Sequence, residues 1–219
     1  MTIPDSKSSE PKSQSALLKI ILPILSVLIL VSFLWQPKPK KTEDQVFADR
    51  IAESVGLVSA EEALKILGEA GGRVALILPG TDDTHFAGSE GGAYERGFQQ
   101  FSQKHSALHF SGHLLTAKPL LTSSLLLSTR DKFTDADLLI SFVGLPLLER
   151  GEANEWRQSR HPQIIAMENS PIRRQQMEQL LKLRLVQTVF LRKHILFPKQ
   201  KPTDAHTLVD LFYQTIRSS

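Results

Sequence analysis

The chain contains no cysteine. This absence excludes disulfide bonds, zinc sites built on thiolates and catalytic cysteine nucleophiles. It leaves the redox compartment of the protein open, because a chain without thiols gives no sign of either environment.

The chain also has little net charge. Among 219 residues, 26 Lys and Arg stand against 23 Asp and Glu, which gives a formal net charge of +3. The basic residues are scattered, whereas nucleic-acid-binding proteins usually gather them on one face. We therefore expect no nucleic-acid partner. The apolar fraction of 41% and the charged fraction of 22% are ordinary for one globular domain with a core.

Motifs that hold phosphates or a serine nucleophile are missing. Gly88, Gly91, Gly92 and Gly97 do not form G-x-G-x-x-G, and no Gly-Lys-Ser/Thr follows them. No G-x-S-x-G elbow is present. The sequence therefore predicts no cofactor and no catalytic residue.

The N-terminal part predicts a membrane anchor. Residues 1–15 are rich in Ser, Pro and Lys and are expected to form a disordered tail. Residues 16–35 are an apolar run long enough to cross a hydrocarbon core of roughly 30 Å, with Lys19 able to snorkel and Trp35 suited to the interface. We expect a single-pass transmembrane helix of the signal-anchor type, followed by an extended Pro/Lys linker at 36–41.

Two alternatives to the anchor are a buried core helix and a cleaved signal peptide. The apolar core of a signal peptide would span about 7–15 residues and end at small residues. This run is longer and ends in Ser32-Phe33-Leu34-Trp35, before a Pro/Lys linker. We therefore favour an uncleaved anchor that holds the protein in the cell membrane. Lysines flank both ends of the run, so the positive-inside rule does not orient it.

The remainder predicts an α/β domain. Residues 42–72 show helical spacing and form a helical lead-in of two helices, the second with a capping-box pattern at Ser59 and Glu62. Residues 73–219 alternate strands and helices, which indicates a Rossmann-like, doubly wound parallel sheet. Its expected strands are 73–78, 107–115, 137–144, 163–167 and 186–191, and the chain closes with an amphipathic helix.

Hydrophobic patterning predicts the strand order. Strands buried on both faces are apolar throughout, whereas strands covered on one face alternate. The first, third and fourth strands are apolar throughout and the second and fifth alternate. The sequence therefore predicts a five-stranded parallel sheet of order 2-1-3-4-5, with the second and fifth strands at its edges.

A ligand site is expected where the strands end. In doubly wound sheets, ligands bind outside the carboxyl ends of the strands, at the switch point of the strand order. Acidic groups after the first strand disfavour phosphates, so we expect a neutral hydroxylic or amine ligand. The residues expected to line this site are Thr81, Asp82, Asp83, Gly144, Glu168, Asn169 and Ser170.

Metal binding receives little support. Asp82, Asp83, His85 and Glu90 carry suitable oxygen and nitrogen donors, but their spacing fits no recognised metal motif. The paired histidines of the second strand, His109 and His113, are expected on one face, yet two ligands do not make a zinc site. We predict no metal.

From Arg73 onward the chain resembles one lobe of the type I periplasmic binding proteins. The stretch "VALILPGTDDTHFAGSEGGAYERGFQQFSQKH" is similar to that family's first strand, ligand loop and long first helix, in which a later glycine matches Gly97. "DADLLISFVGLP" is similar to a strand in the middle of the lobe's sheet. The resemblance implies an extracytoplasmic domain that descends from small-molecule binders. That family clamps its ligand between two lobes, so a single lobe implies either a homo-oligomer or partner that closes the site, or a module without ligand.

Three functions remain open at this point. The favoured one is a membrane-anchored, non-enzymatic domain that binds a small polar ligand or a partner protein. An enzyme would use the same crevice, with Asp82, Asp83 and Glu168 as acid/base or metal groups. A structural interaction module without ligand would instead present an exposed apolar patch, for which the final helix "LVDLFYQTI" is a candidate.

Overall fold

A computed structural model describes residues 41–80, 88–158, 162–170, 173–194 and 201–218. Residues Thr42–Ser219 form one compact unit. The predicted tail, anchor and most of the linker lie outside the described residues. Among the helices that the structure does describe, none has the length and apolar character needed to cross a membrane.

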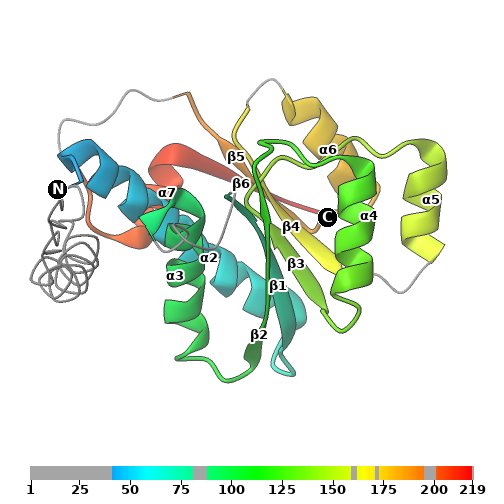
Figure 1. The fold of residues 1–219 in the computed structure, drawn as a ribbon, viewed down its shortest axis with the longest axis horizontal. Helices are drawn as coiled ribbons and strands as arrows, with labels where there is room; N and C mark the ends of the chain where they lie inside the picture. Colours follow the sequence, from blue (N-terminus) through cyan, green and yellow to red (C-terminus); the bar gives the residue numbers. More distant parts are fainter. Residues whose placement is uncertain (1–40, 81–87, 159–161, 171–172, 195–200, 219) are drawn as a thin grey trace, which may run out of the picture. The chain divides into compact units, whose positions relative to one another are not determined.

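Twelve elements alternate along the described chain, as the strand–helix pattern of the sequence predicts (Figure 1). Each helix is followed by a strand. The elements are α2 (Glu43–Leu67), β1 (Gly72–Pro79), α3 (Glu90–Ser102), β2 (Leu108–Thr116), α4 (Ser123–Lys132), β3 (Leu138–Ser141), α5 (Arg150–Gln158), β4 (Gln163–Glu168), α6 (Arg174–Lys182), β5 (Thr188–Arg192), α7 (Ala205–Phe212) and β6 (Tyr213–Arg217).

The sheet has the order β2-β1-β3-β4-β5-β6. The first five strands are parallel, so the predicted order of those five is confirmed. The prediction of five strands was wrong, because β6 adds an antiparallel sixth strand beside β5. The expected final helix ends at Phe212, and the chain becomes extended at Tyr213, where it satisfies the outer hydrogen-bonding groups of β5. For this reason β5 is buried rather than an edge.

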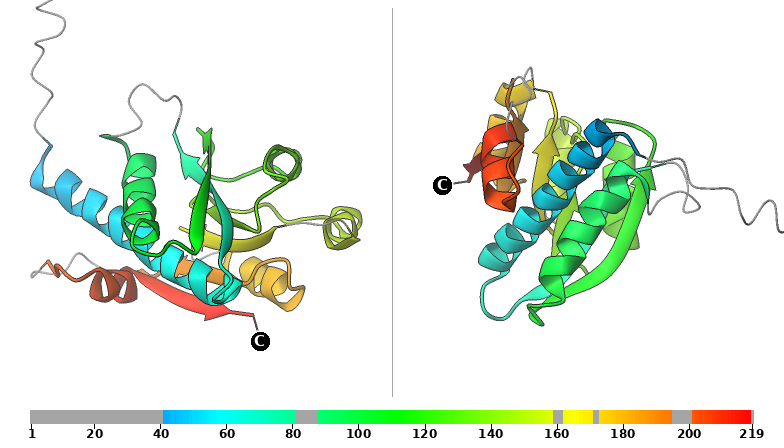
Figure 2. Two further views of the ribbon diagram at one scale, coloured as in Figure 1. Left: turned by 90° about the horizontal axis from the view of Figure 1, so that it is seen from below. Right: turned by 90° about the vertical axis from the view of Figure 1, so that its left-hand side faces the viewer.

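Helices cover both faces of the sheet (Figures 1 and 2). One hydrophobic cluster joins the sheet to α2, α3 and α7, and a second joins it to α4, α5 and α6. Successive side chains of β1 alternate between them: Val74, Leu76 and Leu78 face the first cluster, whereas Ala75 and Ile77 face the second. This two-sided burial explains why β1 is apolar throughout.

The lead-in is one helix, not two. Thr42 caps α2 through a capping box with Gln45, and the helix continues for 25 residues. Ser59, expected to cap a second helix, is buried in the middle of α2. Gly56, near the end of the first predicted helix, does not break α2, because its backbone packs against α3: a Cβ there would lie 2.1 Å from the carbonyl oxygen of Tyr94. Figure 2 shows α2 and α3 side by side.

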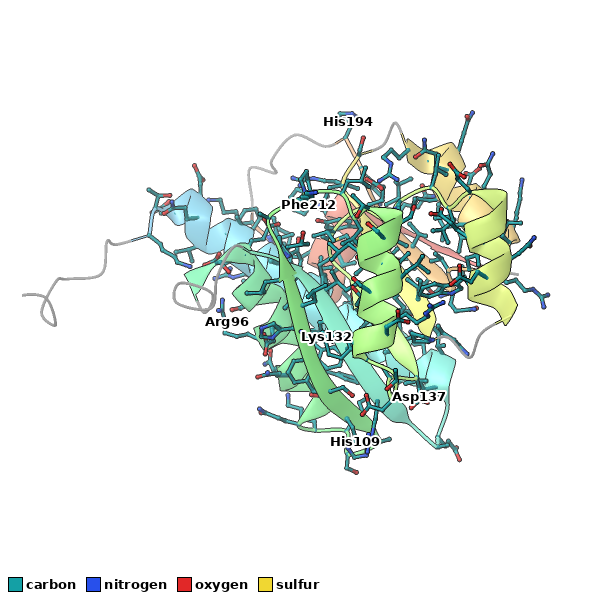
Figure 3. All side chains as sticks on the ribbon, turned by 45° about the vertical axis from the view of Figure 1, so that its right-hand side comes forward. Arg96, His109, Lys132, Asp137, His194 and Phe212 are labelled. Atoms are coloured by element: carbon teal, nitrogen blue, oxygen red, sulfur yellow. The ribbon has the colours of Figure 1, made fainter. Side chains whose placement is uncertain are left out.

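A β-bulge changes the faces of β2. Val74 pairs with Phe110 but Ala75 pairs with Gly112, so Ser111 is the extra residue. His109 and His113 were expected on one face, and that prediction was wrong, because the bulge reverses the alternation between them. His113 lies on the α3 side, where its Nδ1 is 3.1 Å from the Glu95 carboxylate. His109 lies at the amino end of the strand (Figure 3).

A buried carboxylate ties α2 to the last strand. Glu62 is 3% exposed and accepts hydrogen bonds from Arg217 at 2.7 and 2.9 Å and from Lys65 at 2.7 Å. Burial raises the pKa of Glu62, but the hydrogen bonds from Arg217 and Lys65 outweigh burial and hold it below its ordinary value of 4.5.

This lowered pKa predicts an acid-sensitive contribution to stability. Because the pKa is lower in the folded chain than in the unfolded chain, the contribution is present above pH 4.5 and is lost as the pH falls through the folded value. We expect that in Glu62→Gln the free energy of unfolding of residues 42–219, measured with urea, falls less steeply as the pH drops below 4.5. Glu53→Gln, which alters an exposed pair with Arg96, is the control and should not change this pH dependence.

Candidate functional site

The carboxyl ends of the strands form the candidate site. Parallel strands end at a common edge of the sheet, and the switch point lies between β1 and β3. The loop after β1 contains Thr81, Asp82 and Asp83, which lie outside the described residues together with His85 of the metal hypothesis. The described part of the edge consists of the chain after β3 and β4, the start of α3 and the start of β6.

Glu168 and Gly144 meet through an arginine. The Glu168 side chain is 4% exposed, and its Oε2 accepts a hydrogen bond of 2.7 Å from Nη1 of Arg173. Nη2 of Arg173 donates to the carbonyl oxygen of Leu145. Arg173 thus clasps the ends of β3 and β4 together. We call this pair and its carbonyl partner the Arg173 clasp.

Gly144 lies beneath the clasp. A Cβ at this position would lie 2.8 Å from Nη1 of Arg173 and 3.3 Å from Oε2 of Glu168. Its N–H donates to the carbonyl of Pro119 at 2.9 Å, and its own carbonyl accepts from Leu121 at 2.8 Å. The residue is buried, so it gives the guanidinium room and joins the chain after β2 to the end of β3.

Ser170 supports the same carboxylate. Its backbone N–H donates to Oε1 of Glu168 at 3.0 Å, and its carbonyl accepts from the N–H of Arg173 at 3.1 Å. Both oxygens of Glu168 therefore accept hydrogen bonds. The α6 helix begins at Arg174 with Arg173 as its N-cap, so Ser170 is not the N-cap.

A second polar group at this edge contains two tyrosines. The hydroxyl of Tyr94 donates to Oε1 of Glu90 at 2.9 Å, and the hydroxyl of Tyr213 lies 3.5 Å from Oδ1 of Asn169. The two hydroxyls also interact with each other. Both rings are buried, whereas Glu90 and Asn169 are exposed. This tyrosine network, Glu90–Tyr94–Tyr213–Asn169, reaches solvent through its two end members.

The local folding of each tyrosine follows from packing. Tyr94 is fixed on α3 because its ring stacks on Phe142 at a centroid distance of 4.4 Å. Tyr213 is the first residue of β6, opposite Arg192 of β5, which places its ring at the carboxyl edge. Two elements far apart in the sequence thereby bring their hydroxyls together.

Both phenols keep their protons. Burial raises the pKa of Tyr94 well above its ordinary value of 10.0, and its interactions with Tyr213 and Glu90 raise it further. Burial also raises the pKa of Tyr213, against the opposing effect of Arg192. The network therefore presents neutral hydroxyls, an amide and one carboxylate, which suit hydrogen bonding to an uncharged polar molecule.

Three residues of this edge were not predicted from the sequence. Arg173 stands in the basic stretch "SPIRRQQ", which resembles an ordinary solvated helix face. Tyr94 fits the apolar face of α3, so its hydroxyl gave no signal. Tyr213 was placed in a helix, and only the β-branched Thr215 and Ile216 after it hint at a strand.

The opposite edge of the sheet holds a separate hollow. It has a volume of about 640 Å³ and is lined by polar and charged groups that include Arg130, Asp131 and Asp137. It lies at the amino ends of the strands, where doubly wound sheets do not bind ligands. In the described part of the chain, no three His, Asp or Glu side chains gather closely enough to hold a metal ion.

Comparison with known proteins supports the fold. No protein-family model and no curated protein sequence matches the chain. Among solved structures, the glucose-galactose binding protein GanP from Geobacillus stearothermophilus is 12% identical, with a TM-score of 0.50 over 76% of this chain and 60% of that one. The XylFII–LytSN complex gives 17% identity and a TM-score of 0.51 over 76% and 60%. The chain thus spans about 60% of the length of these structures. In its fold, the chain resembles one lobe of the periplasmic sugar-binding proteins.

Proposed function

We propose that the chain is a membrane-anchored, non-enzymatic domain that binds a small polar ligand at the carboxyl edge of its sheet. The observation that carries this proposal is the tyrosine network. In this network the buried hydroxyls of Tyr94 and Tyr213 contact Glu90 and Asn169 and fix their orientation. Glu90 and Asn169 are themselves exposed, so their polar groups are available to a ligand. Fixed polar groups at a strand-end crevice are typical of small-molecule sites.

A neutral polyhydroxylated compound is the ligand class that this edge suits best. The charge of Arg173 is compensated by Glu168, so the clasp does not offer a free cation to an anionic ligand. Hydroxyl, amide and carboxylate groups pair well with sugar hydroxyls. Similarity to GanP, a glucose-galactose binding protein, supports the same class.

The anchor and the location belong to the proposal too. Residues 16–35 are the transmembrane helix, and residues 36–41 link it to the domain. The apolar length of the run and its flanking lysines support the anchor. The likeness to periplasmic sugar-binding proteins supports an extracytoplasmic domain.

A partner protein is the second candidate occupant of this edge. Leu120 and Leu147 are 41% and 47% exposed, and exposed apolar side chains that adjoin one another can mark a protein interface. Leu120 forms an isolated bridge with Gly144, and Leu147 follows Gly144 by three residues. Both leucines therefore lie beside the Arg173 clasp. A second copy of the chain or another protein would cover these side chains while closing the site.

The enzyme alternative has less support. Of its three carboxylates, Glu168 is described, and both of its oxygens are engaged by Arg173 and Ser170. A general base must be free to accept a proton from substrate. Glu168 is therefore better suited to holding the edge together than to catalysis.

The experiment is a thermal-shift screen of residues 42–219 with D-glucose, D-galactose and other monosaccharides, amino acids and nucleosides. A ligand that binds the folded state stabilises it by about 2.7 kcal/mol at a hundred times its Kd. We expect a shift with one class of neutral polar compound, and we expect Asn169→Ala to weaken that binding about tenfold through one lost hydrogen bond.

Asn154→Ala, on the exposed surface of α5, is the matched control and should bind like the parent chain. Stabilisation that is equal in both variants would place the ligand elsewhere. Absence of any shift across the panel would refute small-ligand binding and leave the partner-protein candidate.

A further inference from the structure

Strand β6 is the last strand of the sheet, and one side of its backbone faces outward. The N–H of Ser218 donates to the carbonyl of Gln187 beside β5 at 2.9 Å. In an antiparallel pair, the residues that bond to the neighbouring strand alternate. The N–H and C=O of Thr215 and Arg217 therefore point away from β5. Within the described residues, neither of them forms a backbone–backbone hydrogen bond on that outer side.

The opposite edge strand, β2, is protected from pairing by its irregular backbone. Its register with β1 shifts at the bulge, and Gly112 beside the bulge has a φ of 134°. Bulges twist an edge strand away from incoming strands. The register of β6 against β5 continues without a shift from Tyr213 to Arg217. Of the two edges, β6 is therefore the one that is suited to accept another strand.

A groove lies beside this edge, between α6 and β6. It has a volume of about 490 Å³. Figure 2 shows β6 at the outer margin of the sheet, with α6 beside it. Leu181 and Ile216 contribute apolar lining, and Lys182 and Arg184 contribute cations. The side chains of an extended strand alternate between its two faces, so every second side chain of a strand added to β6 faces this groove.

The groove has a net positive charge. Lys182 and Arg184 are exposed, and among the residues that the structure describes neither forms an ion pair with a carboxylate. The other charged side chains of the lining are neutralised in pairs: Glu178 with Arg174, and Arg217 with Glu62. The uncompensated charge of the two cations favours an acidic occupant.

Arg184 stands at a position that favours glycine. Its φ is 54°, in the left-handed region. Its N–H donates to the carbonyl of Leu181, and that of Leu185 donates to the carbonyl of Leu180, which is the Schellman ending of a helix. A side chain strains this backbone conformation, whereas glycine adopts it freely. An arginine kept at such an exposed position indicates a use for its guanidinium.

We propose that the outer edge of β6 binds an extended acidic peptide of a partner protein, which adds to the sheet as a seventh strand. The peptide backbone pairs with the outward groups of Thr215 and Arg217, as in other cases of strand addition. Its alternate side chains face the groove, where an apolar one contacts the apolar lining and acidic ones pair with Lys182 and Arg184. A second copy of the chain carries the same positive charge in its groove and is the less suited occupant.

Fluorescence anisotropy of a labelled peptide tests the proposal with the full-length chain. The probe is a capped peptide of sequence Glu-Thr-Val-Thr-Glu, which places two carboxylates and one apolar side chain on the same face of an extended strand. We expect saturable binding that weakens as the ionic strength rises. The same peptide methylated at its internal amide nitrogens cannot pair as a strand, and Lys-Thr-Val-Thr-Lys has the wrong charge, so neither should bind.

Variants of the edge and of the groove locate the binding. Thr215→Pro removes an outward N–H but no hydrogen bond to β5, and it should weaken binding about tenfold. Lys182→Glu should weaken binding about fivefold, because it replaces an attraction by a repulsion. Lys104→Glu makes the same change of charge on an exposed side chain beyond the end of α3, and it should bind the peptide like the parent chain.

Arg184→Gly separates peptide binding from folding. Because glycine relieves the strain at this position, the variant should unfold at a higher urea concentration than the parent chain and still bind the peptide about fivefold more weakly. Unchanged binding in both Lys182→Glu and Arg184→Gly would overturn the proposal. Equal binding of the methylated peptide would do the same, as would a dimer of the chain, seen by sedimentation, that Thr215→Pro disrupts and the peptide does not.

Discussion

Replacing Arg173 by alanine is expected to destabilise residues 42–219 by about 3–5 kcal/mol. The substitution leaves the Glu168 carboxylate, 4% exposed, without the guanidinium that compensates its charge. It also removes the donor to the Leu145 carbonyl at the end of β3. Urea denaturation measures the loss as a fall in the midpoint with an unchanged slope.

The adjacent arginine provides the matched control. Arg174 forms a pair with Glu178 in which the two side chains are 51% and 39% exposed. Such surface pairs contribute about 0–1 kcal/mol, so Arg174→Ala should be nearly neutral. If the two alanine variants lose the same stability, the Arg173 clasp does not hold the ends of β3 and β4 together.

Gly97→Ala is the second change with a large expected effect. A Cβ at Gly97 would lie 1.9 Å from the carbonyl oxygen of Glu53 in α2, so α2 and α3 must separate to admit it. Overpacking costs about 1–3 kcal/mol and sometimes more. Because the obstacle is backbone rather than a flexible side chain, we expect a loss near the upper end, about 3 kcal/mol, in urea denaturation.

This loss would occur despite a favourable change in helix propensity. Alanine is better than glycine in a helix by about 1 kcal/mol. At Gly151 of α5, a Cβ would meet no other atom within 4 Å, so Gly151→Ala should be neutral or stabilising. A stabilising effect at Gly97 as well would show that the helices are not in backbone contact there. Separation of α2 from α3 would also displace Tyr94, so Gly97→Ala should weaken ligand binding at the carboxyl edge.

The strand order was predictable because burial leaves a direct mark on the sequence. A strand covered on both faces, such as β1, has no position for a polar side chain. The sixth strand was not predictable in this way, because "LVDLFYQTI" also has helical spacing. What decides its conformation is the unpaired outer edge of β5, a partner more than ten residues away that no local pattern reveals.

The candidate site was predictable in position but not in composition. The doubly wound order alone directs attention to the residues after β3 and β4, and Gly144, Glu168 and Ser170 do meet there. Their meeting depends on Arg173, whose role arises from a three-dimensional contact. The tyrosine network depends likewise on β6. Asp82 and Asp83 lie outside the described residues, and their part in the site stays a prediction.

Ligand binding at the carboxyl edge is tested most directly by hydrogen–deuterium exchange of the full-length chain with and without the strongest ligand of the thermal-shift panel. We predict slower exchange in peptides that contain Glu90, Asn169 and Tyr213. We predict no change around Arg130 and Asp137, which line the hollow at the amino edge. Protection confined to that hollow, with none at the carboxyl edge, would contradict binding at the proposed site.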